Sequence, residues 1–231
     1  RITGSTGSLG FSSDNYKSMD YNQLTSLAKQ PEKMRQNLDG LTEEASTQTT
    51  GASIFSSLIF SPLNKKNGMY RQNQELRLGI GLNSAKEAMV SFKNEDLDTS
   101  LVFCNINSEV TFEAAYVFRH FVSKRIFVYG GVGSNSSISV NNEMMIISGK
   151  YFAPGEHPST QEQQDAVSFA AKPVLHSRIF IPWGIHLQAT DNLSFGLDFR
   201  KGRGLQKTWG QQANMMANTG AVMVGTRFSF N

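Results

Sequence analysis

Charged residues alternate with apolar residues along several segments of this 231-residue chain. In Glu75-Leu76-Arg77-Leu78, the acid and the base would lie on one face of an extended strand and the leucines on the other. Enclosed charges of opposite sign could select ions along a pore, or they could pair and close it. The predicted interior charge network consists of Glu75, Arg77, Glu109, Glu113, Arg119, Arg178, Asp198, Arg200 and Arg227.

The four histidines are candidates for catalytic and metal-binding sites. His157, Ser159 and Asp165 have the residue types of a hydrolase triad, but no nucleophile elbow accompanies them. His176 and His186 are ten residues apart on one predicted strand, which is too far for them to share a metal ion. The sequence therefore predicts no catalytic residue, no metal and no cofactor.

Segments with a period of two residues must position these side chains, and they predict an all-β chain. Some of the segments are strongly alternating, and three, at the start and middle of the chain, are weaker and rich in Ser and Gly. The predicted strands are 2–13, 49–62, 75–82, 109–119, 124–139, 175–188, 193–200 and 222–230.

The connections between these strands alternate strictly between short and long. The short links are 63–70, 122–124 and 189–192, and the long ones are about 15–48, 84–107, 140–174 and 202–218. In an up-and-down antiparallel sheet, this places the short links at one end and the long links at the other. An eight-stranded barrel with both chain ends on the short-turn side follows. If 86–92 and 99–104 form a separate hairpin, the count is ten; we interpret them as strands that continue above the membrane.

One segment has helical rather than strand periodicity. Apolar residues recur at helical spacing between 21 and 44, with Pro31 at the start of a second helix and Gly40 near its end. We expect a helix–Pro–helix insert at about 18–47 in the first long loop. Its apolar side chains must cover the barrel mouth, pack on other loops or bind a partner. The predicted loop interaction surface consists of Leu24, Leu27, Met34, Leu38, Leu41, Met144 and Met145.

Composition alone resembles that of a soluble protein, with 39% apolar and 18% charged residues and a mean hydropathy of −0.32. The two strand faces indicate a membrane barrel instead. One face is uniformly Leu, Ile, Val and Phe, with Tyr116, Phe118 and Trp183 suited to an interfacial girdle, and the other mixes opposite charges with small residues. The net charge of +3 is spread along the chain, so we expect no nucleic-acid partner. A single cysteine, Cys104, excludes a disulfide within the chain.

The chain resembles small Gram-negative outer-membrane β-barrels of the OmpA/OmpX type. Its ending, 222–230, is similar to the C-terminal strand that such proteins present to the barrel-assembly machinery, with Phe228 and Phe230 as the assembly signal, and 191–200 is similar to their penultimate strands. Two features depart from the family pattern. Asn231 follows the terminal aromatic residue, and Pro182 lies within a strand, where we expect a bulge or bend.

The resemblance implies a single transmembrane domain over 1–231, without a peptidoglycan-binding domain, in the outer membrane and with both termini periplasmic. It implies contacts with membrane lipid and lipopolysaccharide, for which Lys201, Arg203 and Lys207 in a long loop are candidates, and with the assembly machinery during insertion. We expect a non-enzymatic accessory subunit that binds other envelope proteins through its extracellular loops. The alternatives are a narrow pore for ions or small solutes and, third, a lipid-modifying barrel enzyme.

Overall fold

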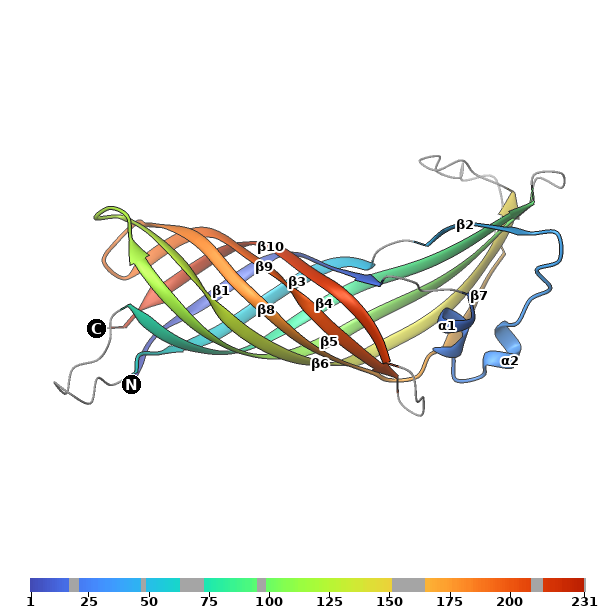
Figure 1. Ribbon diagram of the computed structural model, residues 1–231, viewed down its shortest axis with the longest axis horizontal. Helices are drawn as coiled ribbons and strands as arrows, with labels where there is room; N and C mark the ends of the chain where they lie inside the picture. Colours follow the sequence, from blue (N-terminus) through green and yellow to red (C-terminus); the bar gives the residue numbers. More distant parts are fainter. Residues whose placement is uncertain are drawn as a thin grey trace.

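The fold is an antiparallel barrel with a long extension at one end (Figure 1). The computed structural model describes residues 1–16, 21–46, 49–62, 73–94, 99–150, 165–208 and 214–230. Eight strands pair in the ring order β1-β3-β4-β5-β6-β8-β9-β10, and β10 pairs with β1 to close it. Their bounds are β1 Ile2–Tyr16, β3 Thr49–Phe60, β4 Gln74–Asn94, β5 Thr99–Phe121, β6 Ile126–Lys150, β8 Val174–Gln188, β9 Leu193–Thr208 and β10 Asn214–Ser229. The predicted eight-stranded up-and-down barrel is confirmed.

Both termini lie at the same end of the barrel as the short turns (Figure 1). The turn after β5 is closed by a hydrogen bond of 2.9 Å from the Val122 amide to the Ile126 carbonyl, and Ser123 Oγ accepts from the Ile126 amide at 3.1 Å. The turn after β8 repeats this arrangement with Thr190 Oγ1 and the Leu193 amide. The predicted alternation of short and long links therefore holds for these two turns, whereas 63–72 lies outside the described residues.

The two faces of the barrel wall differ sharply in chemistry. Along β8 every second side chain is buried, including His176, Arg178 and His186, whereas Ile179, outside, is 69% exposed. Large apolar side chains are likewise exposed on the outer face of β1, β3, β4, β5, β9 and β10. A polar interior inside an apolar outer wall is the arrangement of a transmembrane β-barrel, because hydrocarbon rather than water surrounds it.

Pro182 does not produce the expected bulge. Its position pairs with Arg200 of β9, and on the other side the pairs Gly130–Trp183 and Gly133–Phe180 keep one register. Between β6 and β8, only the hydrogen-bonded residue pairs between these two are missing. Proline has no amide proton to donate, which accounts for this local gap in the pairing.

Strands β4, β5 and β6 continue far beyond the ring and form the centre of a second, flatter region that we call the extension (Figure 1). β2 (Thr42–Ser46) pairs with the end of β4, and β7 (Asp165–Ala170) pairs with the end of β6. The expectation that 86–92 and 99–104 continue the neighbouring strands, and do not form a separate hairpin of the ring, is confirmed, since they belong to β4 and β5. The sheet of the extension has the order β2-β4-β5-β6-β7.

The first long loop contains less helix than predicted. α1 spans Tyr21–Ser26, and α2 spans Pro31–Met34 with Pro31 at its start, as expected. Beyond Arg35, which is extended at φ −68° and ψ 120°, the chain makes turns and then strand β2. The helix expected over 35–44 is therefore wrong, because pairing with β4 outweighs a weak helical pattern. Neither α1 nor α2, the helices of the described part of the chain, has the length and hydropathy to span a bilayer.

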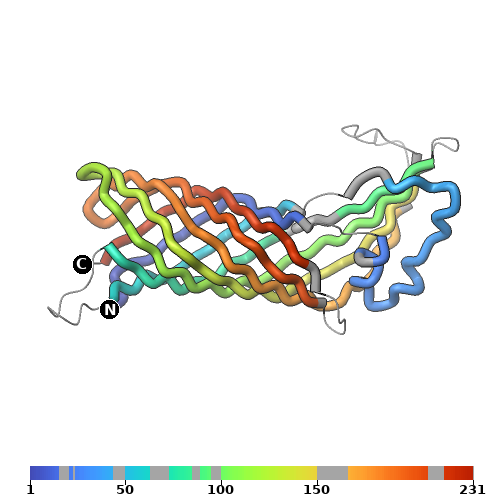
Figure 2. The backbone as a smooth tube through the Cα atoms, in the orientation of Figure 1, coloured from blue at the N-terminus to red at the C-terminus, as the bar shows by residue number. Residues whose placement is uncertain are grey.

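The helices cover the face of the extension that continues the barrel interior. Figure 2 shows segment 21–46 beside the extension, at the end of the molecule away from both termini. The Lys29 amide donates to the Ala170 carbonyl at 2.9 Å, and the Lys172 amide donates to the Leu27 carbonyl at 2.7 Å, which ties the helices to β7 and the residues after it. The core between helices and sheet contains Leu24, Leu27, Ala28, Met34, Val90, Phe92, Phe103, Met144, Ile146 and Ala171, with Leu38 and Leu41 packed against it.

This core corrects the predicted loop interaction surface. Leu24, Leu27, Met34 and Met144 are fully buried, and they are covered by β4, β5 and β6 rather than available to a partner. The stripe had to be buried somewhere, and the strands that continue above the ring supply the apolar face. Met145 points to the opposite face of the sheet, because neighbouring residues of a strand alternate in direction.

Candidate functional site

Glu75 is surrounded by three arginines inside the barrel, near the end that carries the termini. Arg227 Nη2 lies 2.7 Å from Glu75 Oε1, and its Nη1 donates to Oε2 at 2.8 Å. Arg77 Nη2 donates to the same Oε2 at 3.1 Å, and Arg119 Nε lies 3.6 Å from Oε1. The Glu75 side chain is 1% exposed, so a single buried carboxylate holds three guanidinium groups from β4, β5 and β10.

A second carboxylate, Asp198 of β9, collects hydrogen bonds from two aromatic residues. Tyr129 Oη donates to Asp198 Oδ1 at 2.6 Å, and His186 Nε2 lies 2.8 Å from the same oxygen. The Arg77 guanidinium lies 4.3 Å from the centre of the Tyr129 ring. Arg77 therefore links the Glu75 group to the Asp198 group across the lumen.

Glu113 and Arg200 form an ion pair between β5 and β9. The Arg200 guanidinium also lies 4.3 Å from the centre of the Phe55 ring, which faces inward from β3. Stacking of this kind stabilises an arginine that has left water. The pair thus spans the barrel cross-section, from β3 through β9 to β5.

The fourth group lies at the level where the barrel meets the extension. Arg178 Nη2 donates to Asp14 Oδ2 at 2.8 Å and to Glu109 Oε2 at 3.2 Å, and its Nη1 donates to Ser137 Oγ at 2.8 Å. His176 Nδ1 lies 2.9 Å from Glu109 Oε1. All of these side chains are buried, so one arginine joins β1, β5, β6 and β8 across the interior.

The same group contains a set of atoms that could hold a metal ion. One ligand atom each from Asp14, Glu109 and His176 lie within 4.8 Å of one another. Arg178 Nη2 contacts all three residues, including His176 Nδ1 at 2.5 Å. A guanidinium therefore stands among these ligands and supplies the positive charge that they require, so the geometry favours an internal ion pair over a metal site.

The charges of the interior balance. Among the side chains that the structure describes, five buried carboxylates face five arginines, and each arginine has at least one carboxylate partner. The cavity beside Asp14, Arg178 and Arg200 has a volume of about 40 Å³, little more than the share of one water molecule in the liquid. The acids are Asp14, Glu75, Glu109, Glu113 and Asp198, and the bases are Arg77, Arg119, Arg178, Arg200 and Arg227.

The structure brings the nine predicted network residues into the interior and adds others that the sequence reasoning missed. Asp14 is 2% exposed and pairs with Arg178, and Tyr129 binds Asp198. The alternation along β1 could have placed Asp14 inside, because Ser12 and Asp14 point in the same inward direction. It did not, because this Ser- and Gly-rich strand has no clear difference between its two faces.

Other predicted residues are placed as follows. Phe228, in β10, and Phe230, just after it, are each 49% exposed on the outer side of the wall. Lys201, Arg203 and Lys207 lie on β9 and not in a loop as expected, because β9 continues to Thr208. Of the triad residues considered above, His157 and Ser159 fall outside the described part of the chain.

A second candidate surface is the face of the extension opposite the helices, which we call the outer sheet face. Cross-strand pairs place Met89, Cys104 and Met145 side by side on this face. The next pairs along the strands add Val102 and Ile147 in one direction and Ile106 in the other. Cys104 is buried among its neighbours, whereas the other five side chains are partly exposed. The outer sheet face is thus a mainly apolar strip that continues the outer wall of the barrel, with Ser91 beside Val102 and exposed Glu143 beside Ile106.

Comparison with solved structures identifies small outer-membrane proteins. Ail of Yersinia pestis is 12% identical with a TM-score of 0.33, and the match covers 100% of both chains. OprG of Pseudomonas aeruginosa is 10% identical with a TM-score of 0.42 over 100% of this chain and 97% of OprG. Neisserial surface protein A is 12% identical with a TM-score of 0.35 over 98% and 97%.

These likenesses are weak in both identity and superposition, so the barrel assignment depends on the strand order and register given above. At the level of fold, the predicted resemblance to small outer-membrane barrels is confirmed. Compared with protein-family models and with curated proteins, the chain gives no match.

Proposed function

We propose that this chain is a non-enzymatic outer-membrane barrel that anchors an attachment surface for another envelope protein. In this proposal the ring spans the membrane, the termini and short turns are periplasmic, and the extension lies outside the cell. Insertion would use the barrel-assembly machinery, with Phe228 and Phe230 in the strand that the machinery reads.

The observation that carries the proposal is the contrast between the two parts of the chain. Inside the ring, paired charges fill the space that a pore would need, with a cavity of about 40 Å³ beside Arg178. Outside the ring, the extension has a buried core of its own, in which ten side chains from the helical segment, the long strands and the residue after β7 pack together. A sealed barrel with a separately packed extension is better suited to holding a surface in place than to transport.

The outer sheet face is the part of the extension that we assign to the partner. Met89, Val102, Ile106, Met145 and Ile147 are only partly covered, and partly exposed aliphatic side chains in a continuous strip are typical of protein interfaces. Met145 thus retains the interaction role predicted from the sequence, whereas Met144 is in the core. The partner would offer a complementary apolar strip.

Site-specific photocrosslinking in living cells tests this assignment. A photoreactive phenylalanine analogue is placed at Ile106 or Met145, and, as the matched control, at Phe112, which is 60% exposed lower on the same strand as Ile106. We expect both extension positions to yield one discrete adduct with the same protein, and Phe112 to yield none. Ile106→Asp should abolish stoichiometric co-isolation of that protein, while the barrel stays folded and heat-modifiable on gels.

Two outcomes would overturn the proposed function. One is an adduct pattern at Ile106 and Met145 that matches the pattern at Phe112. The other is unchanged co-isolation of the partner with the Ile106→Asp barrel.

A further inference from the structure

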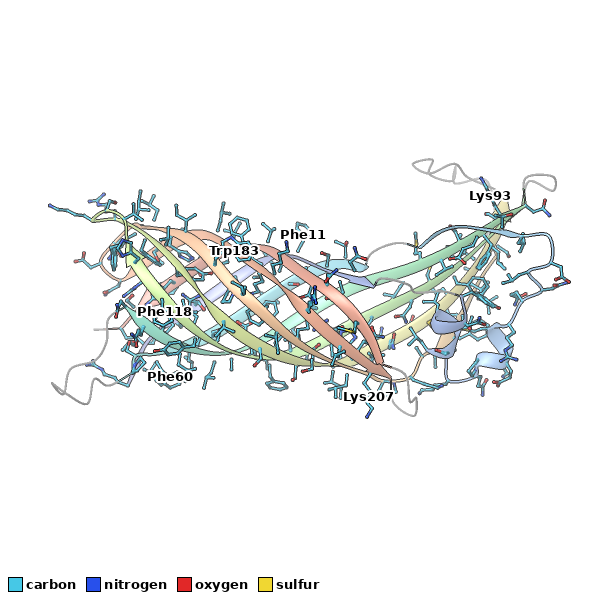
Figure 3. All side chains as sticks on the ribbon, viewed as in Figure 1. Phe11, Phe60, Lys93, Phe118, Trp183 and Lys207 are labelled. Carbon is cyan, nitrogen blue, oxygen red and sulfur yellow. The ribbon has the colours of Figure 1, made fainter. Side chains whose placement is uncertain are left out.

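A row of three basic side chains lies on the outer wall of the barrel at the end away from the termini. Lys201, Arg203 and Lys207 are all exposed, and their odd numbers place them on the outward face of β9. Residues two apart on one face of a strand are separated by about 7 Å. Figure 3 shows Lys207 at the far end of the ring, beyond the labelled aromatic residues Trp183 and Phe11 on the barrel wall.

No acid balances these bases on the surrounding wall. Among the described residues of β8, β9, β10 and β1, the carboxylates are Asp14 and Asp198, and both are buried inside the barrel. The cross-strand neighbours of Arg203 are Ile179 and Asn218, and Lys201 faces Ile181 and Gly220. The row is therefore a concentrated positive charge on an otherwise uncharged wall.

An apolar groove lies directly beside the row. It has a volume of about 510 Å³, and Phe11, Trp183, Phe199 and Val222 line it together with Lys201. Trp183 and Phe199 stack at 5.8 Å with an interplanar angle of 13°. Gly220 keeps the floor open, because a Cβ there would have Ser13 Oγ at 3.7 Å and Arg200 O at 3.8 Å as its nearest neighbours.

Apolar side chains also alternate with the bases themselves. Leu205 lies between Arg203 and Lys207 and is 48% exposed, and Ile179 beside Arg203 is 69% exposed. A water-soluble anionic partner such as a nucleic acid would leave these side chains against water. A ligand that carries both a phosphate and hydrocarbon matches both parts of the surface.

We propose that this face binds the phosphate-bearing head group of an outer-leaflet lipid, with an acyl chain in the groove beside Lys201. In a Gram-negative outer membrane, the abundant lipid of this kind is the lipid A part of lipopolysaccharide. Arg203 would hold a phosphate through its planar donor fork, and the two lysines would contribute charge. The inference depends on the proposed function only for the orientation that brings this end of the barrel to the outer leaflet.

Binding of defined lipids to the purified barrel in detergent micelles tests the inference without reference to any protein partner. The chain has two tryptophans, so Trp209→Phe leaves Trp183, in the groove, as the fluorescent reporter. Diphosphorylated lipid A should change the Trp183 emission at saturation, and dephosphorylated lipid A should bind far more weakly. Inorganic phosphate alone should leave the emission unchanged.

Variants separate charge from folding. Each base near an anionic surface contributes about fivefold in affinity. The variant that combines Lys201→Gln, Arg203→Gln and Lys207→Gln should therefore bind lipid A about 100-fold more weakly. Lys201→Arg with Lys207→Arg keeps the charge and should keep the binding. The matched control is Lys124→Gln with Arg125→Gln, two exposed bases in the turn at the opposite end, which should bind as tightly as the parent.

The inference is wrong if dephosphorylated lipid A binds as tightly as the phosphorylated form. It is also wrong if the triple variant, folded by its heat-modifiable mobility, binds lipid A within threefold of the parent. If Ile106 and Met145 yield no discrete adduct in the crosslinking experiment while lipid A still binds, the proposed function alone is overturned.

Discussion

Replacing Glu75 by Gln is the sharpest perturbation of the barrel interior. The substitution keeps the shape of the side chain but removes the negative charge shared by Arg77, Arg119 and Arg227. Arg227 is the nearest of the three arginines, with guanidinium nitrogens 2.7 and 2.8 Å from the two carboxylate oxygens. Three guanidinium groups would then remain in a nearly dry interior, and Asp198, reached from Arg77 through Tyr129, would be the next carboxylate.

The size of the effect follows from the cost of leaving a buried charge without its partner. That cost is about 3–5 kcal/mol. Because three arginines contact this carboxylate, we expect a decrease of at least ~3 kcal/mol in the free energy of unfolding by the same rule. With a urea dependence of about 2 kcal/mol per molar, the unfolding midpoint should fall by at least ~1.5 M. The assay is urea-induced unfolding in phospholipid vesicles, followed by tryptophan fluorescence.

Two companion variants control the measurement. Asp191→Asn removes an exposed carboxylate in a turn and should change the free energy of unfolding by less than about 0.5 kcal/mol. Adding Arg119→Gln to Glu75→Gln removes one of the stranded charges and should restore part of the stability. The charge-network reasoning fails if the free energy of unfolding of Glu75→Gln lies within about 1 kcal/mol of the parent value, a threshold near the size of one net hydrogen bond.

Three further substitutions probe other parts of the molecule. Leu27→Ala removes a fully buried side chain from the extension core and should destabilise the extension by about 2–5 kcal/mol. In limited proteolysis the extension should be cut faster, while the ring keeps its heat-modifiable mobility. Loss of the ring as well would contradict separate packing of the two parts. Gly225→Ala would bring a Cβ against the Asp198 carboxylate and should cost about 1–3 kcal/mol by overpacking, measured by urea unfolding, with Thr226→Ser as a control on the neighbouring position. Phe228→Ala should lower the amount of barrel inserted in cells several-fold but leave refolding of the purified chain in detergent unchanged; equal loss in both would mean that Phe228 serves stability and not assembly.

The ring could be predicted from the sequence because strand alternation is a local property. In β8 polar and apolar residue types alternate with the direction of the side chain, as Arg178 inside and Ile179 outside show. The same alternation in the other strands predicts the inward direction of the nine network residues. Asp14 was missed because β1 has small polar residues on both faces, so its phase carries little information. The partners of each charge also required the structure, since the link between Asp14 and Arg178 joins residues 164 positions apart.

The extension was harder to predict because its interactions are tertiary. Nothing local to 42–46 indicates a strand, and the segment is extended because it pairs with β4. The apolar stripe of Leu24, Leu27 and Met34 was recognised correctly as something that needs cover. Val90, Phe103 and other residues of the long strands cover this stripe. Their contact with it could not be predicted, because it depends on the path of those strands beyond the ring.

Closure of the barrel interior is tested most directly by electrical recording in planar lipid bilayers. Four interior carboxylates pair with the five arginines, Asp198 is bonded by Tyr129 and His186, and the cavity beside Arg178 has a volume of about 40 Å³. The purified barrel should therefore give no steady single-channel steps. Arg178→Ala, which removes the side chain that joins Asp14 to Glu109, provides the comparison in which closure is weakened. Regular, uniform conductance steps from the unmodified barrel would show an open path and contradict a sealed anchor.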